Sequence, residues 1–400
     1  MLIRKVTIYD AVHEAPYEGD ILIRDGKVAA IGTDLPAEGE VIEGAGLRAY
    51  PGFVDAHSHL GLDSTGGPTG GSNDYNEHND PAVPHLRGID SYNAHDKAIK
   101  LAREGGVTCV GAGPGSANVL GGTFLAVKTV GNSVDEAVVC PAVAMKCAFG
   151  ENPKRCYKDK KISARMTTAA VLREQLFLAK DYLARKEAAG DDVTKRPKFD
   201  MKMEALIPVL KKEIPLKAHA HRADDILTAI RIAKEFDVRI TIEHCTEGHL
   251  IVNELKAAGV RVAVGPTLGH PSKLELLNKS WETPGILAEA GIPVSIITDA
   301  PVIPQEYLPL CAGLAVKAGM DPFKALQAIT INPACHLGIE DRVGSLEAGK
   351  DADIVLTKGD PMVSDSEIVR VIIGGNRNRS SVAHRYCNLR SFFALMCSHS

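Results

Sequence analysis

The chain has 400 residues, of which 45% are hydrophobic and 24% are charged, a composition typical of a folded, enzyme-sized protein. Lys and Arg number 46 and Asp and Glu number 50, which gives a formal net charge of −4. Because charges of both signs are mixed along the chain, no basic surface is expected to hold a phosphate backbone, and nucleic acid is excluded as a partner.

The N-terminal sequence and the cysteines indicate the cellular compartment of the protein. The first residues, MLIRKVTIYD, reach charged side chains within four positions and lack the apolar stretch of a signal peptide. No run approaches the roughly 18 to 20 apolar residues of a membrane span. The nine cysteines are an odd number without CxxC spacing, which favours reduced thiols over a disulfide framework. We therefore expect a cytoplasmic protein with a small-molecule substrate and no membrane contact, and a homo-oligomer is left open.

Both ends of the chain predict short strands. Apolar residues alternate over 5–12 and 19–32, and Asp25-Gly26 lies between two apolar runs, as in a tight hairpin. Residues 340–361 return to short strands and turns, so residues 1–50 and 340–378 are expected to form one discontinuous β-sandwich domain. Residues 379–400 lose all periodicity, and we expect an atypical, disordered tail there.

Residues 51–339 alternate between helices and strands. One unit recurs, in which a helix ends near Gly or Asp and a β-branched run follows, at 102–113, 233–244, 255–267 and 287–300. This alternation indicates a parallel sheet with helices outside. An open doubly wound sheet fits the same pattern, but it usually carries a glycine-rich phosphate loop after its first strand, and the glycine-rich segment 111–122 does not open a helix. We predict an α/β fold with a (β/α)8 TIM-like barrel over 51–339.

The segment PGFVDAHSHLGL (51–62) carries the first chemical signal. Side chains two apart on a strand share a face, so His57 and His59 are expected to point together into the barrel. Two imidazoles so placed can bind one metal ion. The alternative is a pair of solvated histidines that follow a strand.

Three further strand ends carry similar groups. His219 and His221 end the apolar strand of LKAHAH, and Asp299 ends the strand of GIPVSIITDA. His244 ends a third strand and shares the alternation of Ile242, so we expect it to face the same way as that residue. Because the carboxyl ends of barrel strands form the active-site face, these groups predict a metal site there. A helix N-cap is the alternative for Asp299.

Five segments together resemble a known family. PGFVDAHSHLG, AHAH, IEHC, ITDAP and NPACHLGIEDRVGSLEAGKDADIVL are similar to segments of the amidohydrolase superfamily, nearest its imidazolonepropionase-like and prolidase-like branches. The likeness covers roughly residues 1–375 and implies a metal-dependent hydrolase barrel flanked by a β-sandwich. It also implies that His57, His59, His219 and Asp299 are metal ligands, with His244 a second-metal ligand or an oxyanion stabiliser.

This ligand set suits zinc, with one or two ions per chain. Zinc at a catalytic site keeps a position open for water and lowers the pKa of that water from ~15.7 to about 7. Asp299 can take the proton of the water and pass it to the leaving nitrogen. We expect hydrolysis of a C–N bond in a non-standard amide, a cyclic amide or a dipeptide. The alternatives are deamination of an aminated ring and a non-catalytic paralogue, although the latter needs no complete ligand set.

Lys146 bears on the number of metal ions. It is the one charged residue in the apolar run 137–150, and burial favours the neutral amine. In many relatives of the family that this chain resembles, such a lysine becomes a carbamate that bridges two ions. Two alternatives remain open: the side chain snorkels to solvent, or Glu151 is the bridge.

Three further residues are candidates for substrate binding. His221 is a substrate contact or a surface residue, and His270 lies in a loop after a strand, where substrate contacts and plain loop histidines both occur. Arg222 can bind a substrate carboxylate, or it forms an ion pair with Asp224 or Asp225.

Overall fold

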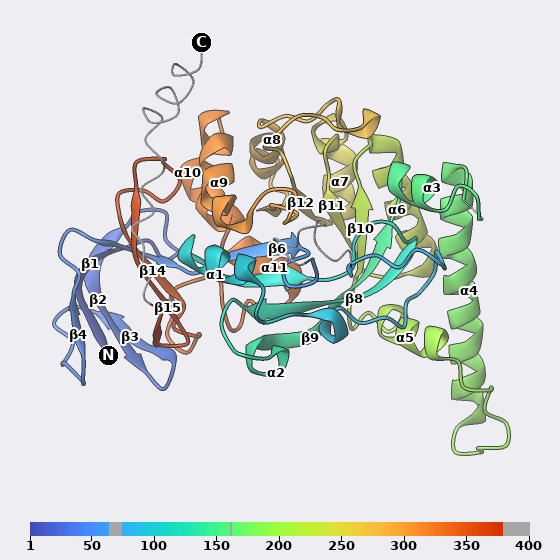
Figure 1. Ribbon diagram of the computed structural model, residues 1–400, viewed down its shortest axis with the longest axis horizontal. Coiled ribbons are helices and arrows are strands. Elements are labelled where there is room, and N and C mark those ends of the chain that lie inside the picture. Colours follow the sequence, from blue (N-terminus) through green and yellow to red (C-terminus); the bar gives the residue numbers. More distant parts are fainter. Residues whose placement is uncertain (64–73, 161, 379–400) are drawn as a thin grey trace, which may run out of the picture.

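The computed structural model describes residues 1–63, 74–160 and 162–378 (Figure 1). The predicted tail, 379–400, lies outside the described residues. Among the described residues, no helix combines the length and the apolar character needed to cross a bilayer.

Strands from both ends of the chain form one sheet, on the left of Figure 1. Its strands are β1 (Leu2–Ile8), β2 (Tyr17–Arg24), β3 (Lys27–Gly32), β4 (Val41–Glu43), β5 (Arg48–Pro51), β14 (Ile354–Lys358), β15 (Glu367–Ile373) and β16 (Asn376–Asn378). They are ordered β16-β15-β14-β5-β1-β2-β3, and β4 pairs with β1. Asp25 and Gly26 both have positive φ, at 50° and 76°, as the predicted hairpin turn between β2 and β3 requires. The sheet encloses its own core, to which Ile3, Ile21 and Ile354 contribute.

The second sheet is the barrel. Its eight strands are hydrogen-bonded in chain order: β6 (Phe53–Ser58), β7 (Val107–Ala112), β8 (Leu120–Lys128), β9 (Val138–Ala148), β10 (Leu216–Ala220), β11 (Ile240–His244), β12 (Arg261–Val264) and β13 (Val294–Ile296). The ends of β6 and β13 meet where the Asp299 amide donates to the His57 carbonyl at 3.2 Å and the His59 amide donates to the Ala300 carbonyl at 2.7 Å. The predicted fold class, a TIM-like barrel with a small β domain, is confirmed.

The alternation of helix and strand is interrupted at β8, which runs antiparallel to both β7 and β9. Parallel neighbours need a crossover of about a dozen residues or more. The connections 113–119 and 129–137 are shorter than this, so the chain reverses twice before the parallel order resumes at β9. The remaining neighbouring pairs are parallel.

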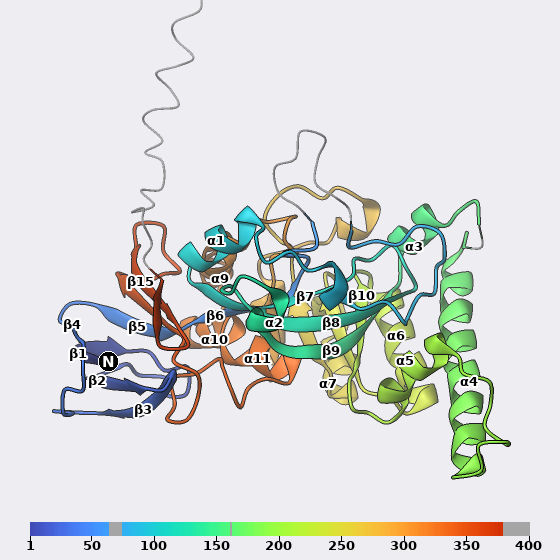
Figure 2. The ribbon, with the colours of Figure 1, turned by 60° about the horizontal axis from the view of Figure 1, so that its bottom comes forward.

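Helices pack around the barrel (Figure 2). They are α1 (Lys97–Glu104), α2 (Val134–Ala137), α3 (Glu151–Cys156), α4 (Arg165–Ala189), α5 (Met201–Leu210), α6 (Ala223–Phe236), α7 (Val252–Ala258), α8 (Thr283–Glu289), α9 (Leu308–Lys317), α10 (Pro322–Ala328) and α11 (Ile331–Leu337). The four predicted helix-to-strand units are α1–β7, α6–β11, α7–β12 and α8–β13. Apolar side chains between helices and strands, among them Ile226, Ile242 and Leu255, form the largest core.

Candidate active site

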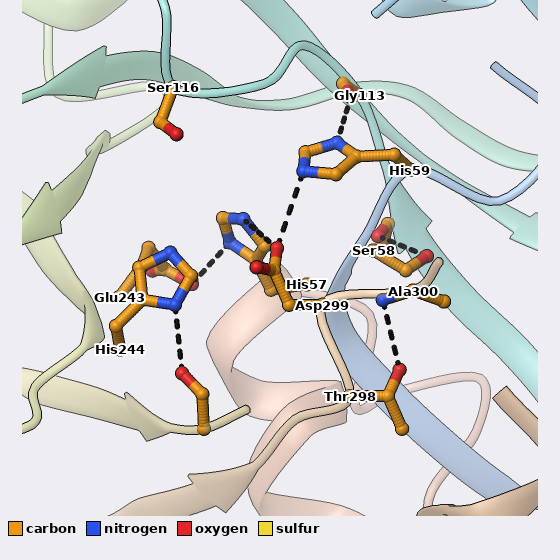
Figure 3. A network of polar contacts seen from close by, with 12 residues as sticks. His57, Ser58, His59, Gly113, Ser116, Glu243, His244, Thr298, Asp299 and Ala300 are labelled. Atoms are coloured by element: carbon orange, nitrogen blue, oxygen red, sulfur yellow. Dashed lines mark hydrogen bonds and ion pairs between the residues drawn. The ribbon is translucent and has the colours of Figure 1, made fainter. Parts of the chain in front are cut away.

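The predicted histidines and Asp299 meet at the carboxyl ends of the barrel strands. Figure 3 shows the side chains of His57, His59 and Asp299 directed at one another. His59 Nε2 lies 3.3 Å from Asp299 Oδ1, and His57 Nε2 lies 3.6 Å from the same oxygen. The other nitrogens are held from behind, because His59 Nδ1 donates to the Gly113 carbonyl at 2.7 Å and His57 Nδ1 donates to Glu243 at 2.9 Å. These bonds fix the tautomers and leave both Nε2 lone pairs facing the carboxylate.

A second group, which we call the histidine cluster, consists of His219, His221 and His244. One nitrogen from each lies within 4.8 Å of the others, and His57, His244 and Asp299 form an overlapping group with the same spacing. His244 Nδ1 donates to the Gly265 carbonyl at 2.8 Å. Neither ring nitrogen of His219, nor Nε2 of His244, has a hydrogen-bond partner among the described residues.

These nitrogens fit a metal ion. Burial lowers the pKa of His57, His219 and His221 well below the ordinary value, and it lowers the pKa of His244 to about 4. The imidazoles are therefore neutral, which is the form that ligates zinc. A buried nitrogen without a partner costs free energy, and a bound cation is a physical reason to keep several of them together.

Asp299 supplies the negative charge of the site. Although burial raises the pKa of Asp299, the adjacent His244 and His59 hold that pKa well below its ordinary value. Asp299 has a φ of 54°, in the left-handed region that few residues other than glycine adopt. Such backbone strain persists where surrounding contacts enforce it, and here it directs the carboxylate toward the histidines.

Lys146 lies directly beside the predicted ligands. Its side chain is fully buried on β9, and Nζ lies 2.9 Å from His57 Nε2. Burial lowers the pKa of Lys146 to about 8. Because the amine is buried, the snorkelling alternative is wrong. Glu151, the other candidate bridge, instead accepts a hydrogen bond from the Glu275 amide at 3.2 Å.

Sequence reasoning missed a buried carboxylate beneath the site. Glu243 Oε2 lies 2.8 Å from Lys217 Nζ, and Glu243 Oε1 lies 2.8 Å from His336 Nε2 on α11. Thr241 also donates to this carboxylate, at 2.8 Å. Burial raises the pKa of Glu243, but Lys217 and His336 lower that pKa by more than burial raises it. The net shift is therefore strongly downward. We call Glu243, Lys217, His336 and Thr241, with His57 Nδ1, the Glu243 network.

The side chain of His244 points into the site, but not for the reason that the sequence suggested. Ile242 packs outward against the helices, and Glu243 is the inward residue of β11. Simple alternation would therefore turn His244 away from the site. His244 instead has a φ of 71°, which breaks the alternation and brings its ring to the cluster. The expectation that His244 and Ile242 face the same way was wrong.

A further buried acid ties the Asp299 loop to β6. Asp55 Oδ2 accepts hydrogen bonds from the amide and hydroxyl of Thr298, at 3.0 and 2.6 Å, and from Gln305 Nε2 at 2.6 Å. Asp55 Oδ1 accepts from the His57 amide at 3.0 Å. Burial raises the pKa of Asp55 to about 6. One carboxylate thus fixes the backbone of His57 and of Thr298, the residue before Asp299.

A pocket of about 440 Å³ opens onto these groups. It is lined by His59, Tyr75, Asn76, His78, Ser116, Ala117, Asn152, Arg155, Cys156, His219, His221, Pro266, Ser272, Lys273, Leu276, Asp299, Pro301 and Val302. His221 is buried here and its Nδ1 is 2.8 Å from the Thr246 hydroxyl, so the surface alternative for His221 is wrong. His270 is exposed, and Arg222 is exposed and pairs with Asp224 at 2.9 Å, so the structure does not bring these two residues to the cluster.

Residues 48–378 match the amidohydrolase family. The chain belongs to this family, as the sequence motifs predicted. An amidohydrolase of Thermotoga maritima MSB8 has a similar solved structure, with a TM-score of 0.91 and 42% identity over 94% of this chain and 99% of that chain.

Two curated relatives are more distant in sequence. Amidohydrolase tasK of Hapsidospora irregularis is 28% identical in an alignment that covers 89% of this chain but only 39% of that protein. The chain thus spans less than half the length of that relative. An imidazolonepropionase of Symbiobacterium thermophilum is 24% identical over 84% of this chain and 83% of its own.

Proposed function

We propose that this amidohydrolase is a metal-dependent enzyme that hydrolyses a C–N bond in a non-standard amide, a cyclic amide or a dipeptide. The observation that carries the proposal is the set of buried, neutral imidazole nitrogens without partners beside the Asp299 carboxylate. Family membership and the similarity to an imidazolonepropionase support the same reading.

His57, His59, His219 and Asp299 would hold the metal, and His244 would be a further ligand or an oxyanion stabiliser. His221 joins these candidates because its ring lies in the histidine cluster. A divalent ion such as zinc would polarise a substrate carbonyl and lower the pKa of a bound water. Glu243 and the Gly113 carbonyl orient His57 and His59 from behind, so their Nε2 atoms stay directed at the site.

Asp299 would act as general base and then as general acid. Its carboxylate is ionised at neutral pH, as an ordinary aspartate is, and it lies beside the Nε2 atoms of His57 and His59, so it can accept the proton of the attacking water. The same carboxyl group would then return that proton to the leaving nitrogen. The pocket beside Asp299, about 440 Å³ in volume, has room for a small substrate.

Metal analysis combined with a substrate screen tests this proposal. The purified protein is assayed against amides, cyclic amides, dipeptides and aminated rings, before and after chelation. Amide or dipeptide cleavage that is lost on chelation and restored by zinc supports the proposal. Ammonia release from aminated rings alone would favour a deaminase, and absence of both metal and turnover would favour a non-catalytic paralogue.

Lys146 would set the number of metal ions. We propose that its amine would react with carbon dioxide, forming a carbamate and releasing a proton, and that the negatively charged carbamate would help to hold a second ion. Its burial beside His57 supports this role. Metal content of Lys146→Ala, with and without added bicarbonate, provides the test. Loss of one ion from two is expected, whereas unchanged stoichiometry and activity would indicate a mononuclear site.

A further inference from the structure

One wall of the active-site pocket carries positive charge. Apart from Asp299, the charged residues in the described lining are Lys273, which follows β12, and Arg155 on α3. Asn152 connects the two: its Oδ1 accepts from Lys273 Nζ at 3.2 Å and from Arg155 Nη2 at 3.5 Å. We call Lys273, Arg155, Asn152 and Ser116 the cationic wall.

Lys273 is held in place by a buried acid. Glu275 is 1% exposed, and its Oε1 lies 2.6 Å from Lys273 Nζ and 3.8 Å from His221 Nε2. One carboxylate oxygen thus lies between the ammonium and the histidine cluster, which places Lys273 close to the proposed metal ligands. An ammonium has three N–H donors. Among the described residues Asn152 accepts one of them, and Lys273 is also in an ion pair with Glu275, so an N–H remains for a ligand in the pocket.

Ser116 adds a second donor to this wall. Asn152 Nδ2 donates to Ser116 Oγ at 2.7 Å, so the hydroxyl proton of Ser116 is available to donate in turn. In Figure 3 the Ser116 hydroxyl points into the space between His59 and His244. Arg155 is exposed at the pocket edge and contributes a further charged donor.

We propose that the cationic wall is a carboxylate subsite, and that the substrate bears a free carboxylate near its scissile C–N bond. This inference rests on the proposed function and narrows its substrate class. Charge-assisted hydrogen bonds from Lys273 and Ser116 would hold the carboxylate, while Asp299, in the lining of the same pocket, would face the reacting carbon. A substrate with a neutral amide in that position would leave these donors poorly paired and would bind more weakly.

The test compares acids with their matched amides. Zinc-loaded protein is titrated with N-acetylated glycine, leucine and phenylalanine and with their primary amides, and binding is measured by calorimetry. Turnover of the same compounds is measured separately, so failure to hydrolyse any of them counts against the proposed function and leaves the binding result valid. We expect the wild type to bind the acids at least about tenfold more tightly than the amides, as a hydrogen bond to a charged group implies.

Three variants locate the selectivity. Lys273→Met leaves Glu275 without its cation, so Lys273→Met/Glu275→Gln is made beside it to remove both charges together and keep the fold. Arg155→Gln removes the exposed cation alone. The matched control is Lys154→Met. Lys154 lies beside Arg155 on α3 but is not among the described residues that line the pocket.

We expect the selectivity for acids to fall below about threefold in the double variant, to fall partly in Arg155→Gln, and to persist in the control. Equal binding of acids and amides by the wild type, or no binding of any acid, would overturn the subsite. Selectivity that survives in both the double variant and Arg155→Gln would also overturn it.

Discussion

The histidine cluster and the carboxylate of Glu243 are both buried in the same barrel, yet they differ in how their polar atoms are paired. His219 and His244 present nitrogens that have no partner among the described residues. Glu243, the residue before His244 on β11, is engaged by Lys217, His57, His336 and Thr241.

This difference distinguishes side chains that can bind a ligand from side chains that hold their neighbours in position. Buried polar atoms are almost always paired, so a group of unpaired nitrogens that face one another indicates a place for a ligand. A fully paired carboxylate instead fixes the orientation of its neighbours. His57 belongs to both regions, because its Nδ1 faces Glu243 and its Nε2 faces Asp299 and Lys146. The following experiments separate the two roles.

The largest effect is expected for His57→Ala/His59→Ala. This change removes two imidazoles beside Asp299, and we expect both the bound metal and the activity to be lost. Metal content measured by mass spectrometry and turnover of the best substrate provide the readouts. The matched control is His270→Ala, since His270 is an exposed histidine. A double variant with its full metal complement and rate would show that these residues are not ligands.

Asp299→Asn is expected to reduce turnover by about 10²–10⁴-fold, because an amide cannot transfer the proton. The fold should remain intact, since asparagine adopts left-handed backbone conformations more readily than most residues and Asp299 has a φ of 54°. The denaturant midpoint checks this second expectation. A loss of less than about threefold would exclude Asp299 as the general base.

Glu243→Gln and His219→Gln compare the two regions directly in metal-free protein. Glu243→Gln leaves the Lys217 ammonium buried without an opposite charge, and we expect a loss of about 3–5 kcal/mol in the free energy of unfolding. His219→Gln breaks no hydrogen bond among the described residues and should cost clearly less. Adding Lys217→Met to Glu243→Gln should recover part of the loss. Equal costs for the two single changes would contradict the distinction between the regions.

The sequence predicted the barrel and the strand-end histidines because both depend on local patterns. The helix-to-strand units and the spacing of His57 and His59 follow from periodicity alone. The same alternation could have indicated Glu243, because it is a polar residue next to the outward-facing Ile242 on its strand. It could also have indicated Lys217, which is two residues before His219 and therefore lies on the same face of the strand. The pairing of His336 with Glu243 joins α11 to β11, and only the tertiary fold brings them together. The turn of His244 depends on a backbone conformation that no residue type in that segment specifies.

The smallest effect is expected for Asp55→Asn, which tests how the Asp299 loop is positioned. Asp55 accepts four hydrogen bonds, two of them from Thr298 and the others from Gln305 and the His57 amide. An asparagine amide turns one acceptor oxygen into a donor that faces other donors, so we expect a loss of about 1–3 kcal/mol in unfolding free energy. Thr298→Val removes a single hydroxyl donor and should cost about 1 kcal/mol. If Asp55 positions Asp299, Asp55→Asn should also lower kcat more than it raises KM, because the base is displaced while the pocket wall around Lys273 is untouched. A variant that lost stability and kept the wild-type kcat would make Asp55 a purely structural residue.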